Sequence, residues 1–396
     1  MLKTINKFDV KNKRVLIRVD FNVPLSDGKV SDDFRIRMAL PTINFCLENG
    51  AAIVLMSHLG RPDGKIVPEL SLVPVGEKLA ELIEIPIKFS DDCVSEDAQD
   101  VSLGLHAGEI HLLENLRFHS EETSNDRNFS ELLAKHGEIF INDAFGTAHR
   151  PHASNVGVTN YFLHKGIGFL FEKELKYLST AIAKPKRPMT LILGGAKIGT
   201  KLKLINKFID EADHIVIGGG MAFTFLKAQG ISVGGSLVDD SMLKIANKIV
   251  KKSREKNKQI QLPSDVVAAQ NMNDGKNKKA FKINNIPKNM SGFDIGPSTI
   301  EQFSKILLES KTIIWNGPMG VFEQPAFSSG TKKIAEILAK AREENDSIVI
   351  VGGGDTAAAV KSFDLIEQMS HVSTGGGASL ELLSGNNLPS VEALEG

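Results

Sequence analysis

The stretch VLIRVDFNVP, residues 15–24, decides the fold class of this chain. Its odd-numbered residues are apolar and point to one side of a strand, whereas Arg18, Asp20 and Asn22 point to the other. A strand inside a parallel sheet is normally apolar on both faces. Polar groups that gather toward its carboxyl end mark the edge at which open α/β sheets bind their ligands. The stretch therefore predicts a parallel-sheet strand that leads into a binding site.

The composition is that of an ordinary globular protein and excludes several classes of function. A chain of 396 residues is long enough for two domains. The net charge of −1 argues against nucleic acid or an anionic membrane as a partner. Two cysteines, Cys46 and Cys93, are too few for a disulfide framework, and no His/Cys/Asp set has the spacing of a zinc site. The N-terminus lacks the apolar core of a signal peptide and no apolar run could span a bilayer, so we expect a cytoplasmic protein.

Short apolar runs alternate with helical patterns along the whole chain, which predicts βαβ units and parallel sheets. We expect helices over about 73–82 and 129–135, and a helix at 172–178 that connects two doubly wound α/β domains, residues 1–170 and 171–387. The breaker KPKRP at 184–188 follows this connecting helix. The predicted strands are residues 51–56, 110–113, 139–142, 190–193, 214–217, 312–315 and 347–351.

Arginines cluster behind the predicted strands of the first half. Arg61, Arg117 and Arg150 follow strands, and Arg35 lies early in a helix that we expect to be capped by Ser31 or Asp32. A guanidinium is a planar fork that matches phosphate and carboxylate oxygens. One such arginine is more often a surface ion pair. Their shared position after strand ends instead favours a binding site for a small anion with several charges.

Glycine runs follow the strands of the second half. The run GGAKIGTK, residues 194–201, departs from a P-loop because it ends in GTK, although open backbone amides and two lysines still suit phosphate. The run GGGDTA, residues 352–357, fits a loose dinucleotide loop, but no acidic residue stands at the next strand end, residues 373–377. Asp355 is placed instead to hold Mg²⁺, which takes one or two carboxylates together with substrate phosphates.

Seven motifs in this order resemble the phosphoglycerate kinase family, and they cover nearly the whole chain. They are RVDFNVP at 18–24, SHLGRP at 57–62, LENLRF at 113–118, NDAFG at 142–146, GGAK at 194–197, WNGPMGVFE at 315–323 and STGGGAS at 373–379. The resemblance implies two doubly wound domains that face each other across a cleft, with a tail at 388–396 that returns to the N-terminal domain. It implies phosphoryl transfer from 1,3-bisphosphoglycerate to ADP, giving 3-phosphoglycerate and ATP.

The same resemblance assigns the site residues. The phosphoglycerate site consists of Asp20, Phe21, Asn22, Arg35, His58, Leu59, Gly60, Arg61, Arg117 and Arg150. The nucleotide site consists of Lys197, Lys201, Gly219, Gly292, Phe293, Asn316, Glu323, Gly353, Gly354, Asp355 and Thr356, with Asp355 on Mg²⁺. Two positions depart from the family's usual pattern, since Phe293 stands where leucine is common and Pro151 where alanine is common.

The residue types in the sequence agree with phosphoryl transfer between a carboxylate and a nucleotide. The acceptor carboxylate is already ionised at neutral pH, so no general base is required. The transfer needs positive charge around the moving phosphoryl group, which we assign to Arg35, Lys197 and Lys201 as catalytic residues, with domain closure to exclude water. We expect a monomer that acts on small molecules. The alternatives are an NAD-dependent dehydrogenase that uses residues 352–357 and a non-catalytic nucleotide-binding protein.

Overall fold

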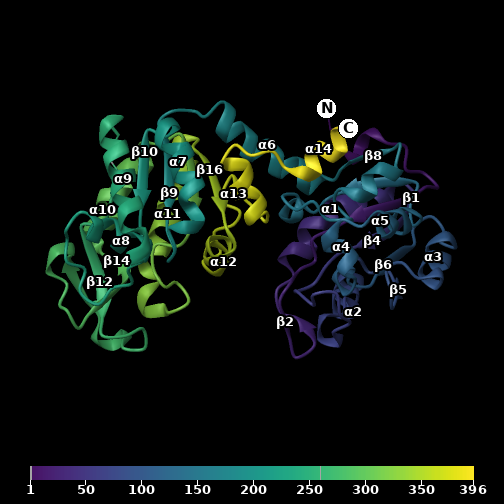
Figure 1. Ribbon diagram of the computed structural model, residues 1–396, viewed down its shortest axis with the longest axis horizontal. Helices are drawn as coiled ribbons and strands as arrows, with labels where there is room; N and C mark the ends of the chain where they lie inside the picture. Colours follow the sequence, from purple (N-terminus) through teal and green to yellow (C-terminus); the bar gives the residue numbers. More distant parts are fainter. Residues whose placement is uncertain (1, 259) are drawn as a thin grey trace. The chain divides into compact units, whose positions relative to one another are not determined.

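The computed structural model describes residues 2–258 and 260–396, which divide into two compact units (Figure 1). Unit 1 contains the chain up to Lys176 together with Asn386–Gly396, and unit 2 contains Tyr177–Gly385. The boundaries expected from the sequence, after residues 170 and 387, lie close to these. Within the described residues, no helix is both long and apolar enough to cross a membrane.

Unit 1 is built on a six-stranded parallel sheet with the strand order β5-β6-β4-β1-β7-β8. Its strands are β1 (Arg14–Arg18), β4 (Ala52–Met56), β5 (Ile87–Ser90), β6 (Ile110–Leu113), β7 (Ile139–Asn142) and β8 (Lys165–Ile167), and a hairpin joins β2 (Leu25–Ser26) to β3 (Lys29–Val30). Its helices are α1 (Phe34–Glu48), α2 (Val73–Ile83), α3 (Glu96–Leu103), α4 (Ser120–Ser124), α5 (Arg127–Ala134), the start of α6 (Phe169–Ala183) and α14 (Pro389–Glu395), with 3-10 turns η1 (Ile5–Lys7), η2 (Pro68–Leu70), η3 (Leu116–Phe118), η4 (Phe145–Thr147) and η5 (Gly157–Tyr161). The backbone of Ser390 in α14 donates a hydrogen bond to Ala148 O, which ties the end of the chain to this unit.

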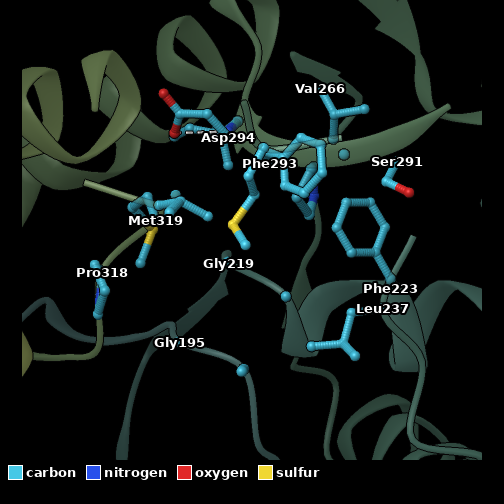
Figure 2. A pocket seen from close by; sticks show the side chains of 18 of the residues that line it. Gly195, Gly219, Phe223, Leu237, Val266, Ser291, Phe293, Asp294, Pro318 and Met319 are labelled. Atoms are coloured by element: carbon cyan, nitrogen blue, oxygen red, sulfur yellow. Dashed lines mark hydrogen bonds between the residues drawn. The ribbon is translucent and has the colours of Figure 1, made fainter. Parts of the chain in front are cut away.

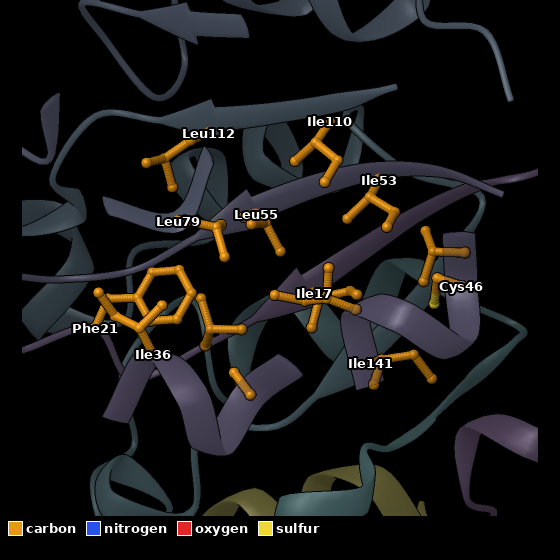
Figure 3. Packing of buried hydrophobic residues seen from close by; sticks show 14 of the residues in the cluster. Ile17, Phe21, Ile36, Cys46, Ile53, Leu55, Leu79, Ile110, Leu112 and Ile141 are labelled. Carbon is orange, nitrogen blue, oxygen red and sulfur yellow. The ribbon is translucent and has the colours of Figure 1, made fainter. Parts of the chain in front are cut away.

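The core of unit 1 forms where apolar strand faces meet helices (Figure 3). Ile17, Ile53 and Leu55 of the central strands pack with Ile36 and Cys46 of α1, and all five side chains are fully buried. Strand β4 is buried along its whole length, which explains its continuous apolar sequence. The sheet is therefore stabilised by burial of the apolar residues that the sequence places in its strands.

The first predicted strand is shorter than residues 15–24, because β1 ends at Arg18. After Val19 the backbone leaves the sheet: Phe21 N donates to Ser57 Oγ at 2.9 Å and Val23 N donates to Phe21 O at 2.8 Å. The alternation in the sequence thus continues into a loop whose backbone hydrogen bonds are made by turns and side chains.

The predicted capping side chain of the following helix is present. Helix α1 begins at Phe34, and Asp33, the residue directly before it, makes no capping hydrogen bond with its side chain. Asp32 Oδ1, from one of the two predicted residues, instead accepts a hydrogen bond from Phe34 N at 2.9 Å. Arg35 thus lies in the first turn of α1.

Unit 2 contains a second six-stranded parallel sheet, in the order β11-β10-β9-β15-β16-β17, and a three-stranded antiparallel sheet, β13-β12-β14, that the sequence did not predict. The parallel strands are β9 (Met189–Leu193), β10 (His214–Ile217), β11 (Ile260–Gln261), β15 (Thr312–Asn316), β16 (Ile348–Gly352) and β17 (His371–Val372); the antiparallel ones are β12 (Asp265–Ala269), β13 (Lys279–Lys282) and β14 (Ser291–Ile295). The helices are α7 (Leu202–Glu211), α8 (Met221–Ala228), α9 (Leu243–Glu255), α10 (Pro297–Glu309), α11 (Ser329–Asn345), α12 (Gly354–Ser362) and α13 (Gly377–Leu383), with 3-10 turns η6 (Gly199–Lys201), η7 (Asp240–Met242), η8 (Gly275–Asn277), η9 (Ile283–Asn285) and η10 (Pro325–Phe327).

Candidate functional site

A pocket in unit 1, here called the arginine pocket, brings together three of the predicted arginines. It has a volume of about 510 Å³ and is lined by Arg61, Asp63, Gly64, Arg117, Ser120, Thr123, Arg150 and His152. Burial, together with the neighbouring charges of Arg150 and Arg18, lowers the pKa of Arg117 to about 10. Among the residues that the structure describes, Arg117 Nε is buried without a hydrogen-bond partner. A concentration of like charge with an unpartnered donor is what an anion site requires.

Asp20, Arg35 and His58 form a second group at the carboxyl ends of the neighbouring strands β1 and β4. Arg35 Nη1 donates to Asp20 Oδ2 at 2.7 Å, and His58 Nδ1 lies 3.9 Å from Asp20 Oδ1. Burial, and after it the charges of Arg18 and Arg117, hold the pKa of His58 well below its ordinary value. His58 is therefore a neutral polar group, and the guanidinium of Arg35, one third exposed at 32%, is the charge in this group that a ligand can reach.

Asn22 and Gly60 connect the two groups. Asn22 Oδ1 accepts from Gly60 N at 2.9 Å, while Gly60 O accepts from Arg117 Nη1 at 2.7 Å. Gly60 adopts a positive φ of 62°, which favours glycine. The side chains of Phe21 and Leu59 lie in the core of the unit, so only their backbone could touch a ligand.

Arg18 lies beneath these residues as a fully buried charge and takes no part in the lining. Its Nε donates to Ser154 Oγ at 2.8 Å, and Ser154 Oγ donates in turn to Glu122 Oε1 at 2.7 Å. Burial lowers the pKa of Arg18, and the charges of Glu122 and Asp20 offset this shift only in part. The sequence placed Arg18 on the polar face of the strand; the structure makes it an internal support.

Unit 2 contains a larger pocket, here called the glycine-rich pocket, with a volume of about 550 Å³ (Figure 2). Backbone of Gly195 and Gly219 forms one wall, and a Cβ on Gly219 would lie 2.6 Å from Gly195 N, so only glycine fits there. Phe223, Leu237 and Met319 supply apolar surface, as Figure 2 shows. Apolar walls beside glycine backbone that a ligand can approach closely suit a ligand with a flat ring and phosphates.

The predicted nucleotide-site residues fall into two sets, those that line this pocket and those, here called the polar border, that do not. Those that line it are Gly219, Gly292, Phe293, Glu323 and Asp355; those outside its lining are Lys197, Lys201, Asn316, Gly353, Gly354 and Thr356. Of the lining residues, Phe223 and Leu237 were not predicted, because neither belongs to a motif or to a strand end. Met319 lies within the motif at 315–323, which could have indicated it.

The border is held by contacts around Asn316, at the end of β15. Lys201 Nζ contacts Asn316 Oδ1, and Thr356 Oγ1 accepts from Gly317 N at 2.7 Å. Asn316 Nδ2 is buried and has no hydrogen-bond partner among the described residues. Burial lowers the pKa of Lys201, and the charge of Asp355 opposes this shift only in part. The border therefore offers donors beside the pocket.

Asp355 fits the role of a Mg²⁺ ligand. It is exposed, it lies in the first turn of α12 and it lines the glycine-rich pocket. Mg²⁺ in nucleotide sites is commonly held by one or two carboxylates and by the phosphates themselves. Asp355 thus supplies the carboxylate that Mg²⁺ needs from the protein.

Two α/β units, one with an arginine-lined pocket and the other with a glycine-rich pocket, define a phosphotransferase with a small anionic substrate. The family model of phosphoglycerate kinase matches residues 5–386. Phosphoglycerate kinases of Chloroherpeton thalassium and Chlorobium phaeobacteroides are 48% and 49% identical, each covering 99% of this chain and 98% or 99% of the relative. A solved phosphoglycerate kinase structure from Coxiella burnetii is 40% identical with a TM-score of 0.87, covering 100% of this chain and 99% of that one.

The chain belongs to the phosphoglycerate kinase family. Its reaction is phosphoryl transfer to and from the carboxyl group of phosphoglycerate, a step of glycolysis, and the family uses ATP and ADP. The dehydrogenase alternative for residues 352–357 is therefore wrong, as is the alternative of a non-catalytic nucleotide-binding protein.

Proposed function

We propose that the arginine pocket and the adjoining group of Asp20, Arg35 and His58 bind 3-phosphoglycerate or 1,3-bisphosphoglycerate. The observation that carries this assignment is the convergence of Arg61, Arg117 and Arg150 on one pocket. Guanidinium groups bind phosphate and carboxylate oxygens through paired, charge-assisted hydrogen bonds. The same positive charge disfavours a neutral ligand of similar size, because desolvated guanidinium groups need oxygen acceptors.

The glycine-rich pocket binds ADP or ATP in this proposal. Phe223 and Phe293 provide apolar surface for the base, while Gly195 and Gly219 allow the phosphates to approach the backbone. Lys201 and the unpartnered Nδ2 of Asn316 then face the phosphates from the border. Each substrate thus has its own pocket on its own unit.

The transfer is driven by charge and position in this scheme. The carboxylate of 3-phosphoglycerate is ionised at neutral pH and attacks phosphorus without a general base. Arg35, Lys197 and Lys201 stabilise the negative charge on the phosphoryl oxygens during transfer. His58, neutral because of its lowered pKa, acts as a polar contact and carries no proton in the reaction.

Asp355 holds Mg²⁺ in the proposed complex with the nucleotide. When bound, the ion neutralises phosphate charge and orients the phosphates. We further propose that the protein works as a monomer in the cytoplasm. Both cysteines are free and buried, which suits a reducing compartment. Sedimentation of the purified protein at several concentrations tests the monomer.

Calorimetric titration with 3-phosphoglycerate and, separately, with Mg-ADP tests the pocket assignment. Replacing Arg61 or Arg150 by Ala should weaken phosphoglycerate binding by about 1.5–3 kcal/mol and leave Mg-ADP binding unchanged. Arg37→Ala is the matched control, because Arg37 is an exposed arginine of α1 that pairs with Asp33 and does not line the pocket. Unchanged phosphoglycerate affinity in both pocket variants would refute the assignment.

A further inference from the structure

Three side chains with different metal-binding atoms meet in unit 1, outside both pockets described above. Asp92 and Cys93 lie in the loop between β5 and α3, and His119 lies between η3 and α4. A carboxylate oxygen, the thiol sulfur and an imidazole nitrogen of these residues all lie within 4.8 Å of one another. Asp92 Oδ2 and His119 Nε2 are only 2.8 Å apart. Since Cys93 and His119 are 26 positions apart in the sequence, only the fold brings them together.

We propose that Asp92, Cys93 and His119 form a binding site for a divalent transition-metal ion such as Zn²⁺. Zinc is bound at about 2.0–2.3 Å by thiolate, imidazole and carboxylate ligands. At tetrahedral angles these bond lengths put ligand atoms about 3.4–3.6 Å apart. Side-chain rotations that move the ligand atoms by about 1 Å would bring the three atoms to those separations. The fourth position is left for water or an external ligand.

The loop that carries two of the ligands is already held in place. Asp92 Oδ1 accepts from Val94 N at 2.7 Å and from Ser95 N at 2.9 Å, which leaves Oδ2 directed at His119. Cys93 O lies 3.1 Å from His136 Nε2. Groups behind a metal ligand that fix its orientation typically increase affinity. The arrangement thus supplies both the ligands and the support for two of them.

The exposure of the three groups fits entry of an ion from solvent. The side chains of His119 and Asp92 are 28% and 35% exposed, whereas Cys93 is buried. In the metal-free cluster, His119 Nε2 and Asp92 Oδ2 share a hydrogen bond of 2.8 Å, and the thiol of Cys93 lies beside them. Binding then releases the thiol proton and the Nε2 proton to solvent, with Sγ and Nε2 each giving an electron pair to the ion.

The chemistry of the three ligand atoms also determines which metal ions can bind the cluster. A thiolate and an imidazole favour Zn²⁺ or Co²⁺, whereas Mg²⁺ prefers oxygen ligands in an octahedron. The cluster is therefore chemically distinct from the proposed Mg²⁺ ligand Asp355. The two sites also lie on different units of the chain.

Titration of the full-length reduced protein with Co²⁺ tests the proposal, because a thiolate–cobalt bond absorbs strongly in the near ultraviolet. We expect a single saturable charge-transfer band that Zn²⁺ abolishes and excess Mg²⁺ does not. Cys93→Ala should remove the band, and His119→Gln should weaken Co²⁺ binding at least about tenfold. Cys46→Ala is the matched control for the thiol, and His106→Ala controls for an exposed histidine.

Asp92→Asn provides a test that preserves the loop, since an amide oxygen can still accept from Val94 N and Ser95 N. It should also weaken Co²⁺ binding at least about tenfold, with the circular dichroism spectrum of the protein unchanged. No thiolate band in the wild-type protein, or a band that persists in Cys93→Ala and disappears in Cys46→Ala, would overturn the proposal. Unaltered affinity in both His119→Gln and Asp92→Asn would overturn it as well.

Discussion

Removal of the Lys201 ammonium tests the proposed catalytic charge most directly. Lys201 is partly buried against Asn316, whereas Lys197 is exposed on the preceding turn. A unit charge about 4 Å from a phosphate oxygen contributes about 4 kcal/mol at an effective dielectric constant of about 20, but about 1 kcal/mol in water. If charge develops in the transition state, Lys201→Ala should lower kcat by about 10²–10³. Lys197→Ala should lower it only about fivefold.

The assay compares steady-state rates in both directions with the affinity for Mg-ADP measured separately by calorimetry. Lys201→Ala should keep its nucleotide affinity within about threefold, because the interaction is assigned to the transition state. Lys201→Met retains most of the side-chain volume and controls for packing. A variant that loses affinity but keeps kcat would make Lys201 a binding residue. Wild-type kinetics in Lys201→Ala would show that the lysine is only a solvated cation.

Three further predictions follow from the geometry. Gly292→Ala should weaken Mg-ADP binding at least about tenfold and leave 3-phosphoglycerate binding unchanged in calorimetry, because the new Cβ would lie 2.3 Å from an atom of the Phe223 ring. Asp355→Asn should raise the Mg²⁺ concentration for half-maximal activity at least about tenfold, and an unchanged Mg²⁺ dependence would contradict its role as ligand. Burial lowers the pKa of both His111 and His136 to about 4, so the unfolded chain binds protons that the folded protein excludes, and stability should fall as pH decreases from about 6.5 to about 4. The loss approaches about 3 kcal/mol per histidine at the lower limit; urea unfolding at pH 7, 6 and 5 measures it, and a flat dependence would be inconsistent with the burial argument.

Much of the strand framework could be predicted because strands inside a parallel sheet are buried on both faces. The predicted strands 110–113, 139–142 and 214–217 have the bounds of β6, β7 and β10. In contrast, the antiparallel sheet of unit 2 has such an apolar run only in β12, where residues 266–269 read VVAA. Its strand β13 is mostly exposed and has the sequence KAFK, which lacks a continuous apolar run. A strand whose stability comes from its neighbours shows little pattern of its own.

The residues of the candidate sites could likewise be predicted only in part. Arg61, Arg117 and Arg150 could be proposed together from sequence, because parallel strands end at one edge of a sheet and so bring their following loops together. The separate fates of Arg18 and Arg35 could not be predicted. Both are arginines near the same strand end, yet Arg18 is fully buried and paired with Ser154, whereas Arg35 remains reachable. That difference depends on the side chains that pack around each one.

The sequence by itself determined the α/β class, the approximate positions of most parallel strands and the residue types that phosphoryl transfer requires, since these depend on local pattern and on motifs. Only the tertiary structure decided where β1 ends, that Phe21 and Leu59 belong to the core, and that Phe223 lines the glycine-rich pocket. It alone also brought Cys93 to His119. The physical reason is that burial, pKa shifts and ligand geometry arise from atoms distant in the chain, and no local pattern records those contacts.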